Sequence, residues 1–460
     1  MVEAFKYDKI IKYLVTATCT EPLHIGDGDN TNGKVLVHPV DGKPFVQASS
    51  ISGILRAYYK MAYGDEETDW LFGSEKHEEN SIQQESKLRI SDGSFPRDDL
   101  DIELRPRLKI DPRTGTCDNS DVQGTDRKSG QKFEMEYIGA GTQIEFCIYL
   151  FDIGSREKLE SVFRAIQWQQ VQLGGQKSNG CGCLQIDELK YMEFNMTCED
   201  GRILWMQEDE LDKDLYETIS LSDRDEKPYP VYAYEITVTG KTDGELLVRS
   251  MMATGYNDQK LNCQNIQNAK MDYIIPGSSL KGVIRSQMER IASYLLVEDI
   301  IGDTFGIPAE KGKEGKGGNI RFLDTIIGTK EKNDTNRMTH HIHIDKFTGG
   351  VMHGGLFTEK NAYGAVTFRI KILDKNQPER TCGLLLLALR DLAAGMVSIG
   401  SGRNVGKGFI EVEKLKIKSS DGTQASIIIK TGFFKDKKEI IKKCLSAVKR
   451  EKNETLCESD

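Results

Sequence analysis

A stretch of twelve residues that occurs twice is the feature that most limits how this chain can fold. Residues 45–56 align without a gap to residues 274–285, at a constant offset of 229 positions. Further landmarks follow in the same order in both halves. These pairs are Phe72-Gly73 with Phe305-Gly306, Arg89 and Asp92 with Arg321 and Asp324, residues 110–115 with residues 344–349, and Gly174, Gly180 and Gly182 with Gly400, Gly406 and Gly408. Such an ordered series indicates a tandem duplication, so we expect two copies of one domain.

The duplication also suggests how the 460 residues are divided. A chain of this length is expected to hold two or three domains, each able to bury its own core. We expect a first domain over residues 1–198, an acidic linker over 199–229, a second domain over 230–420 and a charged C-terminal tail over 421–460 that is helical.

The composition is typical of a soluble globular protein, with 38% hydrophobic and 29% charged residues. We find no apolar run of about 18 residues, the length that a membrane-spanning helix needs, and therefore expect no contact with a membrane. The N-terminus lacks the apolar core of a signal peptide. The ten cysteines form no Cys-x-x-Cys pair. We expect them to be reduced thiols in the cytoplasm.

The net charge of −9 by itself argues against nucleic-acid binding, but the charge is unevenly distributed along the chain. Residues 199–227 contain eleven acidic and four basic side chains, so this segment alone carries most of the negative charge. The rest of the chain is nearly neutral and contains local basic clusters, such as residues 105–109. Because local patches decide whether a phosphate backbone can bind, a nucleic-acid partner stays open.

Each copy shows the same predicted order of elements: strand, helix, strands, hairpin insertion, strand, helix, glycine loop, strand. This order favours a split βαβ arrangement on an antiparallel sheet, which is a common scaffold for RNA binding. The predicted fold class is therefore α+β, with two tandem ferredoxin-like (RRM-like) domains that carry hairpin insertions.

The repeated stretch itself predicts an anion site at a helix start. Unpaired N–H groups and the positive end of the helix dipole lie at such a start, and a serine can cap it. The second copy adds two cations one helical turn apart. The candidate residues are Gly277, Ser278, Ser279, Lys281 and Arg285 in the second copy, and Ser49, Ser50 and Arg56 in the first. An ordinary capped helix with solvated cations is the alternative.

Two other kinds of segment could contact an anion. The glycine loops near residues 174–182 and 400–408 carry Lys177, Arg403 and Lys407. They follow a helix and precede a strand, the reverse of a nucleotide-binding glycine motif, so no ATP site is expected. The long insertion of the first copy has seven basic and four acidic residues between positions 105 and 132, including Lys109 and Arg113. A plain surface loop is the alternative there.

Aspartates in the loop after the first strand are candidates for chemistry. Asp27 and Asp29 lie there, and the corresponding loop of the second copy contains Asp258. Asp27 and Asp29 could hold a metal ion or take part in acid–base catalysis, although Asp in such loops usually serves turn geometry. His340, His341 and His343 alternate along a predicted strand and would face both sides, so no three-histidine metal site is expected.

With these motifs in place, the chain resembles the CRISPR-associated RAMP superfamily. The resemblance rests on residues 274–282, on the Ile-Asp-x-x-Thr-Gly pattern of residues 344–349 and on the late glycine loop. More narrowly, the chain is similar to the backbone subunits of type III effector complexes, as a fusion of two such units. The first copy departs from the pattern at Gln47, Ala48 and Ser52. We therefore expect its helix start to bind the guide differently or less tightly.

The resemblance implies a mechanism. Backbone subunits bind a CRISPR RNA at the helix start and the glycine loop, and a hairpin called the thumb kinks the duplex of guide and target. An aspartate in the loop after the first strand cleaves the complementary target RNA with a divalent metal, Mg²⁺ or Mn²⁺. The matching positions are Asp29, then Asp27, in the first copy and Asp258 in the second, with Asp29 and Asp258 as metal ligands. Other effector subunits are implied as partners.

Two further interpretations remain open from the sequence. The chain could bind the guide without catalysis, as a structural or guide-capping subunit. It could also be a processing endoribonuclease of the same superfamily, which would use His or Tyr as acid and base. His24 is the histidine placed for that role.

Overall fold

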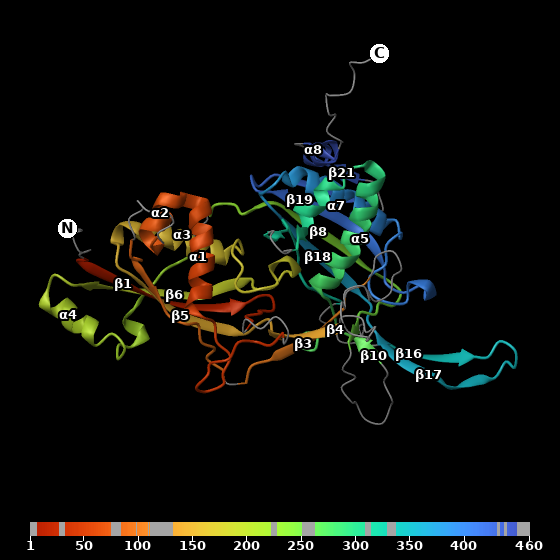
Figure 1. The fold of residues 1–460 in the computed structure, drawn as a ribbon, viewed down its shortest axis with the longest axis horizontal. Helices are drawn as coiled ribbons and strands as arrows, with labels where there is room; N and C mark the ends of the chain where they lie inside the picture. The colour runs from red at the N-terminus through yellow and green to blue at the C-terminus, as the bar shows by residue number, and fades with distance from the viewer. Residues whose placement is uncertain are drawn as a thin grey trace, which may run out of the picture. The chain divides into compact units, whose positions relative to one another are not determined.

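The chain forms two compact units, as seen in a computed structural model (Figure 1). Unit 1 comprises residues 1–104, 135–177 and 181–230, and unit 2 comprises residues 105–134, 178–180 and 231–460. The structure describes residues 7–26, 33–74, 84–97, 99–108, 110, 132–221, 228–250, 263–308, 314–328, 337–429, 433–436 and 439–448.

Unit 1 is built on a five-stranded sheet with the strand order β2-β5-β1-β6-β7. Its strands are β1 (Lys9–Cys19), β2 (Leu88–Ile90), β5 (Gln143–Leu150), β6 (Leu184–Asn195) and β7 (Glu217–Thr218), and all neighbours pair antiparallel. Its helices are α1 (Ala48–Tyr63), α2 (Asp65–Phe72), α3 (Arg156–Gln167) and α4 (Glu199–Met206), with short 3₁₀ turns η1 (Ile153–Ser155), η2 (Lys177–Asn179) and η3 (Lys213–Leu215). Helix α1 buries Ile51, Leu55 and Tyr58, which recur at helical spacing and direct one side of the helix to the core.

Unit 2 repeats the plan with a six-stranded sheet in the order β14-β18-β8-β19-β20-β21. Its strands are β8 (Tyr232–Asp243), β14 (Ile320–Phe322), β18 (Ala365–Leu373), β19 (Phe409–Ser419), β20 (Gln424–Ile428) and β21 (Phe433–Lys435). Its helices are α5 (Gly277–Leu295), α6 (Asp299–Phe305), α7 (Pro378–Ala393) and α8 (Ile440–Ala447), with the 3₁₀ turn η4 (Arg403–Val405). One large apolar cluster joins α5, α7 and α8 to one face of the sheet.

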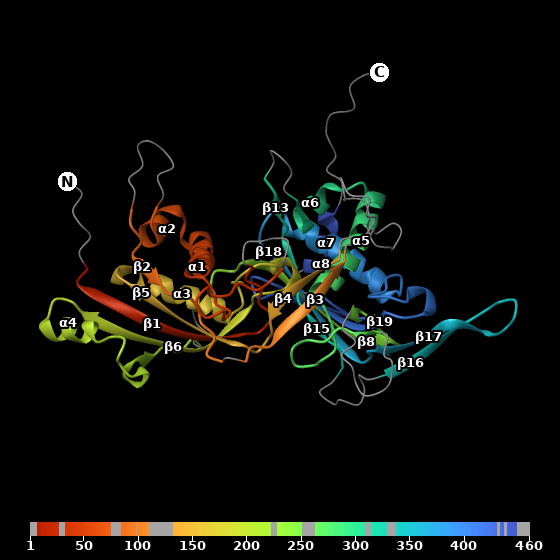
Figure 2. The same cartoon turned by 60° about the horizontal axis from the view of Figure 1, so that its bottom comes forward.

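The remaining strands form ribbons and short ladders. A two-stranded ribbon joins β3 (Ile102–Leu108) to β4 (Lys132–Ile138). A hairpin of β16 (Arg337–Ile344) and β17 (Val351–Asn361) projects from unit 2 (Figure 2). The short strands are β9 (Arg249–Ser250), β10 (Cys263–Asn265), β11 (Ile274–Ile275), β12 (Gly306–Ile307), β13 (Lys316–Gly317) and β15 (Thr325–Ile326).

The predicted fold class is confirmed. In chain order each unit runs strand, helix, strand, strand, helix, strand, and the four shared strands lie in the spatial order second, third, first, fourth. This is the ferredoxin-like arrangement, and it occurs twice. The predicted hairpin insertion of the second copy is β16–β17. In the first copy β3 and β4 flank residues 111–131, which lie outside the described residues.

The segment predicted as an acidic linker is for the most part a folded portion of unit 1. Helix α4 places Trp205 edge-on against Tyr149 and Phe194, with ring centroids 5.7 and 5.2 Å apart. Glu208 accepts a hydrogen bond from Tyr149 (2.9 Å) and pairs with the buried Lys12. The prediction of a linker rested on the charge of this segment and did not consider that Trp205 could pack against the sheet. Residues 222–227 lie outside the described residues.

The C-terminal segment also differs from the predicted helical tail. Strands β20 and β21 extend the sheet of unit 2, and only Ile440–Ala447 is helical within the described part of this segment. Helix α8 buries Ile440, Ile441 and Cys444 and packs closely on α7 at Gly383, where an added Cβ would lie 2.1 Å from the Cys444 carbonyl oxygen. Apolar residues within the charged stretch therefore decide its structure.

Glu208→Ala is expected to destabilise unit 1 by about 3 kcal/mol, because it leaves the buried Lys12 ammonium without its carboxylate. The hydrogen bond to Glu208 and nearby charges raise the pKa of Lys12 against the lowering effect of burial. Urea unfolding of the full chain, followed by hydrogen exchange of β1 and β5 peptides, measures the change. Glu210→Ala, at an exposed position of the same segment, should change stability by less than about 0.5 kcal/mol. Equal effects would contradict a buried ion pair.

Candidate functional site

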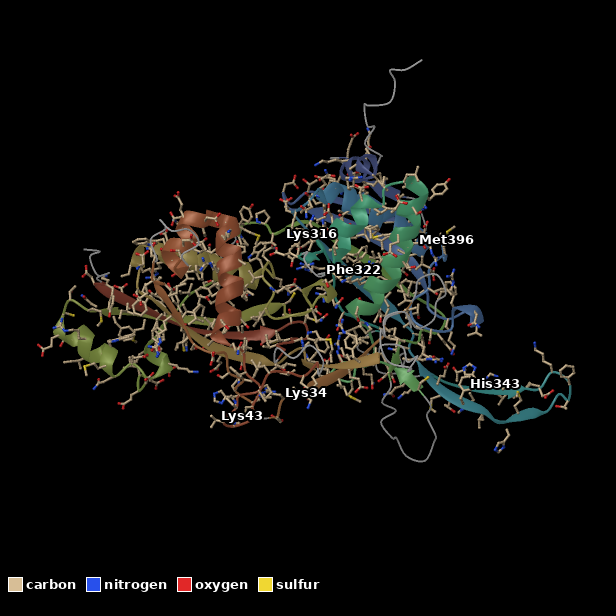
Figure 3. The ribbon with its side chains drawn as sticks, viewed as in Figure 1. Lys34, Lys43, Lys316, Phe322, His343 and Met396 are labelled. Atoms are coloured by element: carbon tan, nitrogen blue, oxygen red, sulfur yellow. The ribbon has the colours of Figure 1, made fainter. Side chains whose placement is uncertain are left out.

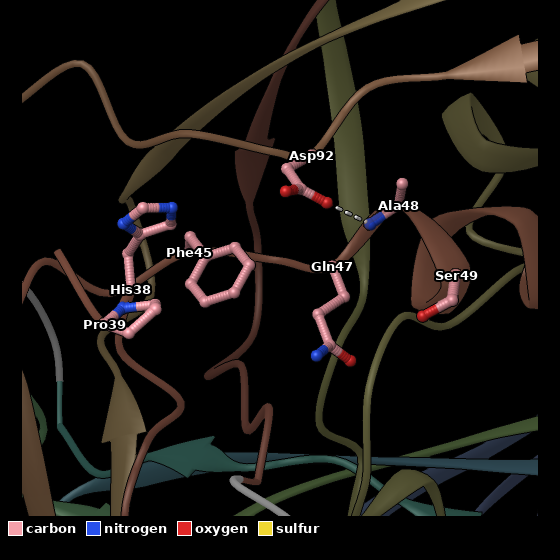
Figure 4. A pocket seen from close by; sticks show the side chains of 7 residues that line it. All are labelled: His38, Pro39, Phe45, Gln47, Ala48, Ser49 and Asp92. Carbon is pink, nitrogen blue, oxygen red and sulfur yellow. Dashed lines mark hydrogen bonds between the residues drawn. The ribbon is translucent and has the colours of Figure 1, made fainter.

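Helix α5 begins against a carboxylate from a neighbouring strand segment. The Gly277 N–H donates to Asp324 Oδ1 at 2.8 Å, and Arg105 Nη1 lies 2.6 Å from Asp324 Oδ2. The side chains of Arg105 and Asp324 are only 8% and 11% exposed. In unit 1 the Ala48 N–H donates to Asp92 Oδ1 at 2.7 Å in the same way (Figure 4). The repeated aspartate therefore fixes both helix starts.

The serine cap expected at the start of α5 is not formed, and α1 has none either. The capping positions are Gln47 and Pro276, neither of which caps through its side chain, and the paired serines lie inside the first turn. Ser49 is exposed, whereas Ser278 and Ser279 are half-buried. A carboxylate is a stronger acceptor at the positive end of a helix than a hydroxyl, and the aspartates occupy that place.

Gly277 is required by close packing of the backbone. An added Cβ would lie 2.1 Å from the Phe322 carbonyl oxygen and 2.6 Å from that of Asn179. Gly180, at φ +82°, would place a Cβ 2.5 Å from the same Phe322 oxygen. Residues 178–180 belong to unit 2, so part of the first glycine loop lies at the start of α5. The sequence predicted both segments as anion contacts but did not predict that they meet.

Lys281 is the centre of a group of cations at this helix start. Its Nζ donates to Ser178 Oγ at 2.9 Å. Burial, together with the positive charges of Arg285, Arg321 and Arg107, lowers the pKa of Lys281 to about 8. No ion pair joins Lys281 to a carboxylate among the described residues. A bound anion would offset this repulsion, so the group is suited to a phosphate.

Two arginines of the group, Arg285 and Arg321, are held by the protein. Arg285 Nε donates to Glu289 at 2.7 Å, and its guanidinium lies 5.5 Å from the Phe305 ring centre. Arg321 Nη1 donates to the backbone oxygens of Gly318 (2.8 Å) and Ile320 (3.0 Å), and burial lowers its pKa. Fixed side chains lose little entropy when a ligand binds.

The corresponding helix start in unit 1 is much less positive. Ser52 takes the place of Lys281, and Arg56 is engaged by Asp69 (2.8 Å) and the Gly73 carbonyl oxygen (3.0 Å). Ser50, in the first turn of α1, is half-buried. A hollow of about 360 Å³ opens there, and Figure 4 shows the side chains that line it: His38, Pro39, Phe45, Gln47, Ala48, Ser49 and Asp92.

The structure places Lys407 inside the protein instead of at a free anion contact. Its Nζ lies 2.7 Å from Glu359 and 3.2 Å from Glu245, and its side chain is 7% exposed. The two carboxylates neutralise its charge. Arg403 is exposed on η4 and donates to the Met396 carbonyl oxygen (3.0 Å), and Lys177 is half-buried in η2.

The other candidates from the sequence fall outside the described residues. These are Asp27, Asp29, Lys109, Arg113 and Asp258. His24 is described: it is buried, and its Nδ1 lies 2.9 Å from the Glu136 carbonyl oxygen. Within the described ranges, no three or more His, Cys, Asp or Glu side chains are grouped as metal ligands. No helix there is both long and apolar enough to span a membrane.

The hairpin β16–β17 carries exposed apolar side chains to its tip. Asp345 accepts from the N–H groups of Thr348 (3.0 Å) and Phe347 (2.7 Å), and these bonds lower the pKa of its carboxyl. Phe347 is fully exposed at this turn. Figure 3 labels His343, which lies on the same hairpin. The exposed apolar residues of the hairpin are Met338, Ile342, Ile344, Phe347, Val351, Met352 and Leu356.

The sequence analysis missed the roles of Asp324, Arg105, Arg107 and Arg321. The shared Arg-x-x-Asp spacing was visible as a landmark of the duplication. The role of the aspartate as a helix cap was not visible, because the helix that it caps begins 47 residues earlier in the chain.

Comparison with known proteins identifies the family. Two regions, residues 16–185 and 250–411, match the RAMP superfamily, and together they make up most of the chain. The chain belongs to the RAMP superfamily. Its two matched regions coincide with the two tandem copies, which confirms the family resemblance drawn from the motifs. No curated protein matches.

Among solved structures, the chain is similar to one in the cryo-EM structure of the Type III-B Cmr-beta bound to cognate target RNA. The two are 16% identical with a TM-score of 0.32, and the match covers 40% of this chain and 61% of that one. Neither sequence is therefore matched over its whole length.

Asp324→Ala should destabilise the start of α5 by about 3 to 5 kcal/mol, because it removes both a helix cap and the partner of the buried Arg105. Asp92→Ala is the matched control: Asp92 caps α1, and within the described part of the chain no arginine forms an ion pair with it, so the expected cost is about 1 kcal/mol. Hydrogen exchange of peptides from the two helix starts, in the full chain, reports each local stability. Similar losses at both sites would refute the role given to Arg105.

Proposed function

We propose that the chain binds a CRISPR RNA as a backbone subunit of a type III effector complex, and that it is a fusion of two such units. The observation that carries the proposal is the group of cations around Lys281 at the start of α5. Its partners would be the CRISPR RNA, complementary target RNA and other subunits of the complex, in the cytoplasm.

The group fits an RNA phosphate for two physical reasons. The first turn of α5 presents backbone N–H groups at the positive end of the helix dipole. Lys281, Arg285, Arg321 and Arg107 then supply positive charge, and the three arginines help to depress the pKa of Lys281. Asp324 already takes the Gly277 N–H, so the phosphate would contact the side chains and the following amides of the turn.

The two copies would bind the guide unequally. Unit 1 has Ser52 in place of Lys281, and Asp69 engages Arg56. Electrostatic attraction for a phosphate is therefore weaker at α1 than at α5. The hollow beside α1, lined by His38 and Phe45, suits a base or sugar more than a phosphate.

We further propose that the hairpin β16–β17 is the thumb that kinks the duplex of guide and target. Its exposed Phe347 and neighbouring apolar side chains support this role, because such side chains can insert between bases and stack on them.

Cleavage of target RNA is the catalytic part of the proposal, with Asp29, Asp27 and Asp258 as the candidates. A carboxylate suits a hard cation such as Mg²⁺ or Mn²⁺, which would stabilise charge on the reacting phosphate. Without catalysis, the chain would be a structural or guide-capping subunit. The processing endoribonuclease is less favoured, because His24 is buried against Glu136 and Tyr137.

RNA affinity of the wild-type protein should fall on the order of tenfold between pH 7 and pH 9. With a pKa of about 8, Lys281 loses its proton over this range in the free protein, whereas a bound phosphate favours the ammonium form. Fluorescence anisotropy with a labelled single-stranded RNA at constant ionic strength measures the effect. Lys281→Arg keeps its charge at both pH values and should lose most of the dependence. Identical pH profiles for both proteins would exclude Lys281 as the titrating contact.

In the assembled complex, Asp29→Ala or Asp258→Ala should abolish one discrete cut in a labelled complementary RNA while guide binding persists. The reason is that each removes the carboxylate proposed to hold the metal or orient the attacking group. Cut sites are mapped with Mg²⁺, with Mn²⁺ and with a chelator, which should stop all cleavage. Asp27→Ala separates the two candidates of the first copy: loss of a cut in this variant, but not in Asp29→Ala, would assign catalysis to Asp27 instead. If every cut survives all three substitutions, the chain is a structural subunit and other subunits cleave.

A further inference from the structure

The face of the unit 2 sheet opposite α7 and α8 is basic and polar. Helices α7 and α8 contact the opposite face, which carries the apolar core. On β19, Lys414, Lys416 and Lys418 occupy alternate positions and project from the same side, about 6.8 Å apart. They pair across the sheet with Thr239, Thr237 and Glu235. The exposed cations of this face are Lys241, Arg369, Lys414, Lys416 and Lys418.

The carboxylates of this face leave part of the charge unmatched. Glu411 lies 3.1 Å from Lys241, and Glu235 lies 3.9 Å from Lys418. No ion pair joins Lys414 or Lys416 to a carboxylate within the described part of the chain. The centre of the face is therefore positive.

The corresponding face of unit 1 is closed by the chain itself. At positions equivalent to Lys371 and Lys414 of unit 2, unit 1 has Tyr149 and Glu188. The acidic segment after β6 covers the face, with Trp205 against Tyr149 and Glu208 against Lys12. In unit 2 the segment after β19 instead continues as β20 in the plane of the sheet. The face is therefore covered in unit 1, whereas in the described part of unit 2 Lys414, Lys416 and Lys418 are exposed on it.

The side chains on the open face favour a phosphate backbone over a protein partner. Lysine, arginine and threonine are the residues that contact nucleic-acid phosphates. Protein interfaces instead rely on buried aromatic and apolar anchors and are depleted in lysine. Two rows of paired residues cross β18, β8 and β19 at the centre of this face. One row is Arg369, Thr237 and Lys416, and the other is Thr367, Thr239 and Lys414. Neither row contains an aromatic residue.

We propose that this open face of unit 2 is a second RNA-contact surface, which holds a strand through its phosphates without reading its sequence. It is distinct from the start of α5, and it rests on the RNA-binding function proposed above.

The test compares Lys414→Gln/Lys416→Gln with Lys375→Gln/Lys442→Gln in the full chain. All four lysines are exposed in unit 2, and each pair removes the same charge. The probe is a labelled single-stranded RNA of about 40 nucleotides with no complementarity to a known target, titrated at several salt concentrations. The first variant should flatten the slope of log affinity against log salt by about 1.4, or about 0.7 for each phosphate that a lysine no longer neutralises. The control pair should leave the slope unchanged.

Each other outcome overturns the inference. If the wild type does not bind the RNA, the proposed function itself fails. If the wild type binds and both double variants keep its slope, RNA binding stands and the open face does not contact RNA. If the first variant changes self-association in sedimentation velocity without changing the salt slope, the face binds another copy of the chain.

Discussion

The carboxylate of Asp324 determines the electrostatic character of the start of α5. It neutralises Arg105 and accepts the first amide of the helix, so neither of these attracts an external anion. The remaining positive charge is displaced one turn along, to Lys281 and the arginines around it. The buried pair also holds Arg105 beside the helix. Asp324 therefore affects both the stability of the start of α5 and the position of the positive charge there.

The two copies use different chemistry at one buried position. In the aligned glycine loops, Lys407 of unit 2 corresponds to Cys181 of unit 1. The equivalent β-bridges Leu246–Ala362 and Leu23–Ile138 give the register of the neighbouring strands. In this register Glu359 corresponds to Met135, and Asn361 corresponds to Tyr137. Unit 2 therefore buries a network of ion pairs where unit 1 buries a small apolar cluster. Apolar groups of similar volume often replace a buried ion pair without loss of stability. In unit 2 the ion pairs make the charge of Lys407 unavailable to a ligand. Its position in a glycine loop had instead predicted an anion contact.

The sequence was sufficient to predict the fold and insufficient to predict the site. Periodic apolar residues and repeated landmarks predicted both ferredoxin-like copies, since these signals are local or recur at a fixed offset. The cap from Asp324 and the burial of Lys407 depend on contacts between residues 47 to 162 positions apart. The spacing of residues along the chain does not reveal these contacts. Charge counting failed for the segment after β6, because Trp205 and the pairing of Glu208 with Lys12 outweigh its acidity.

The uneven placement of that acidity makes the net charge of −9 compatible with the proposed RNA ligand. Much of the negative charge lies in the segment that covers the outer face of unit 1, where it pairs with Lys12 and would repel a phosphate backbone. Exposed charges act over about 10 Å at moderate salt, so the charges carried by each face decide its own attraction for a phosphate. Among the described residues, the acidic segment closes the sheet face of unit 1, and the corresponding face of unit 2 stays basic. If RNA binds this face as proposed, a strand would then bind in one way instead of two.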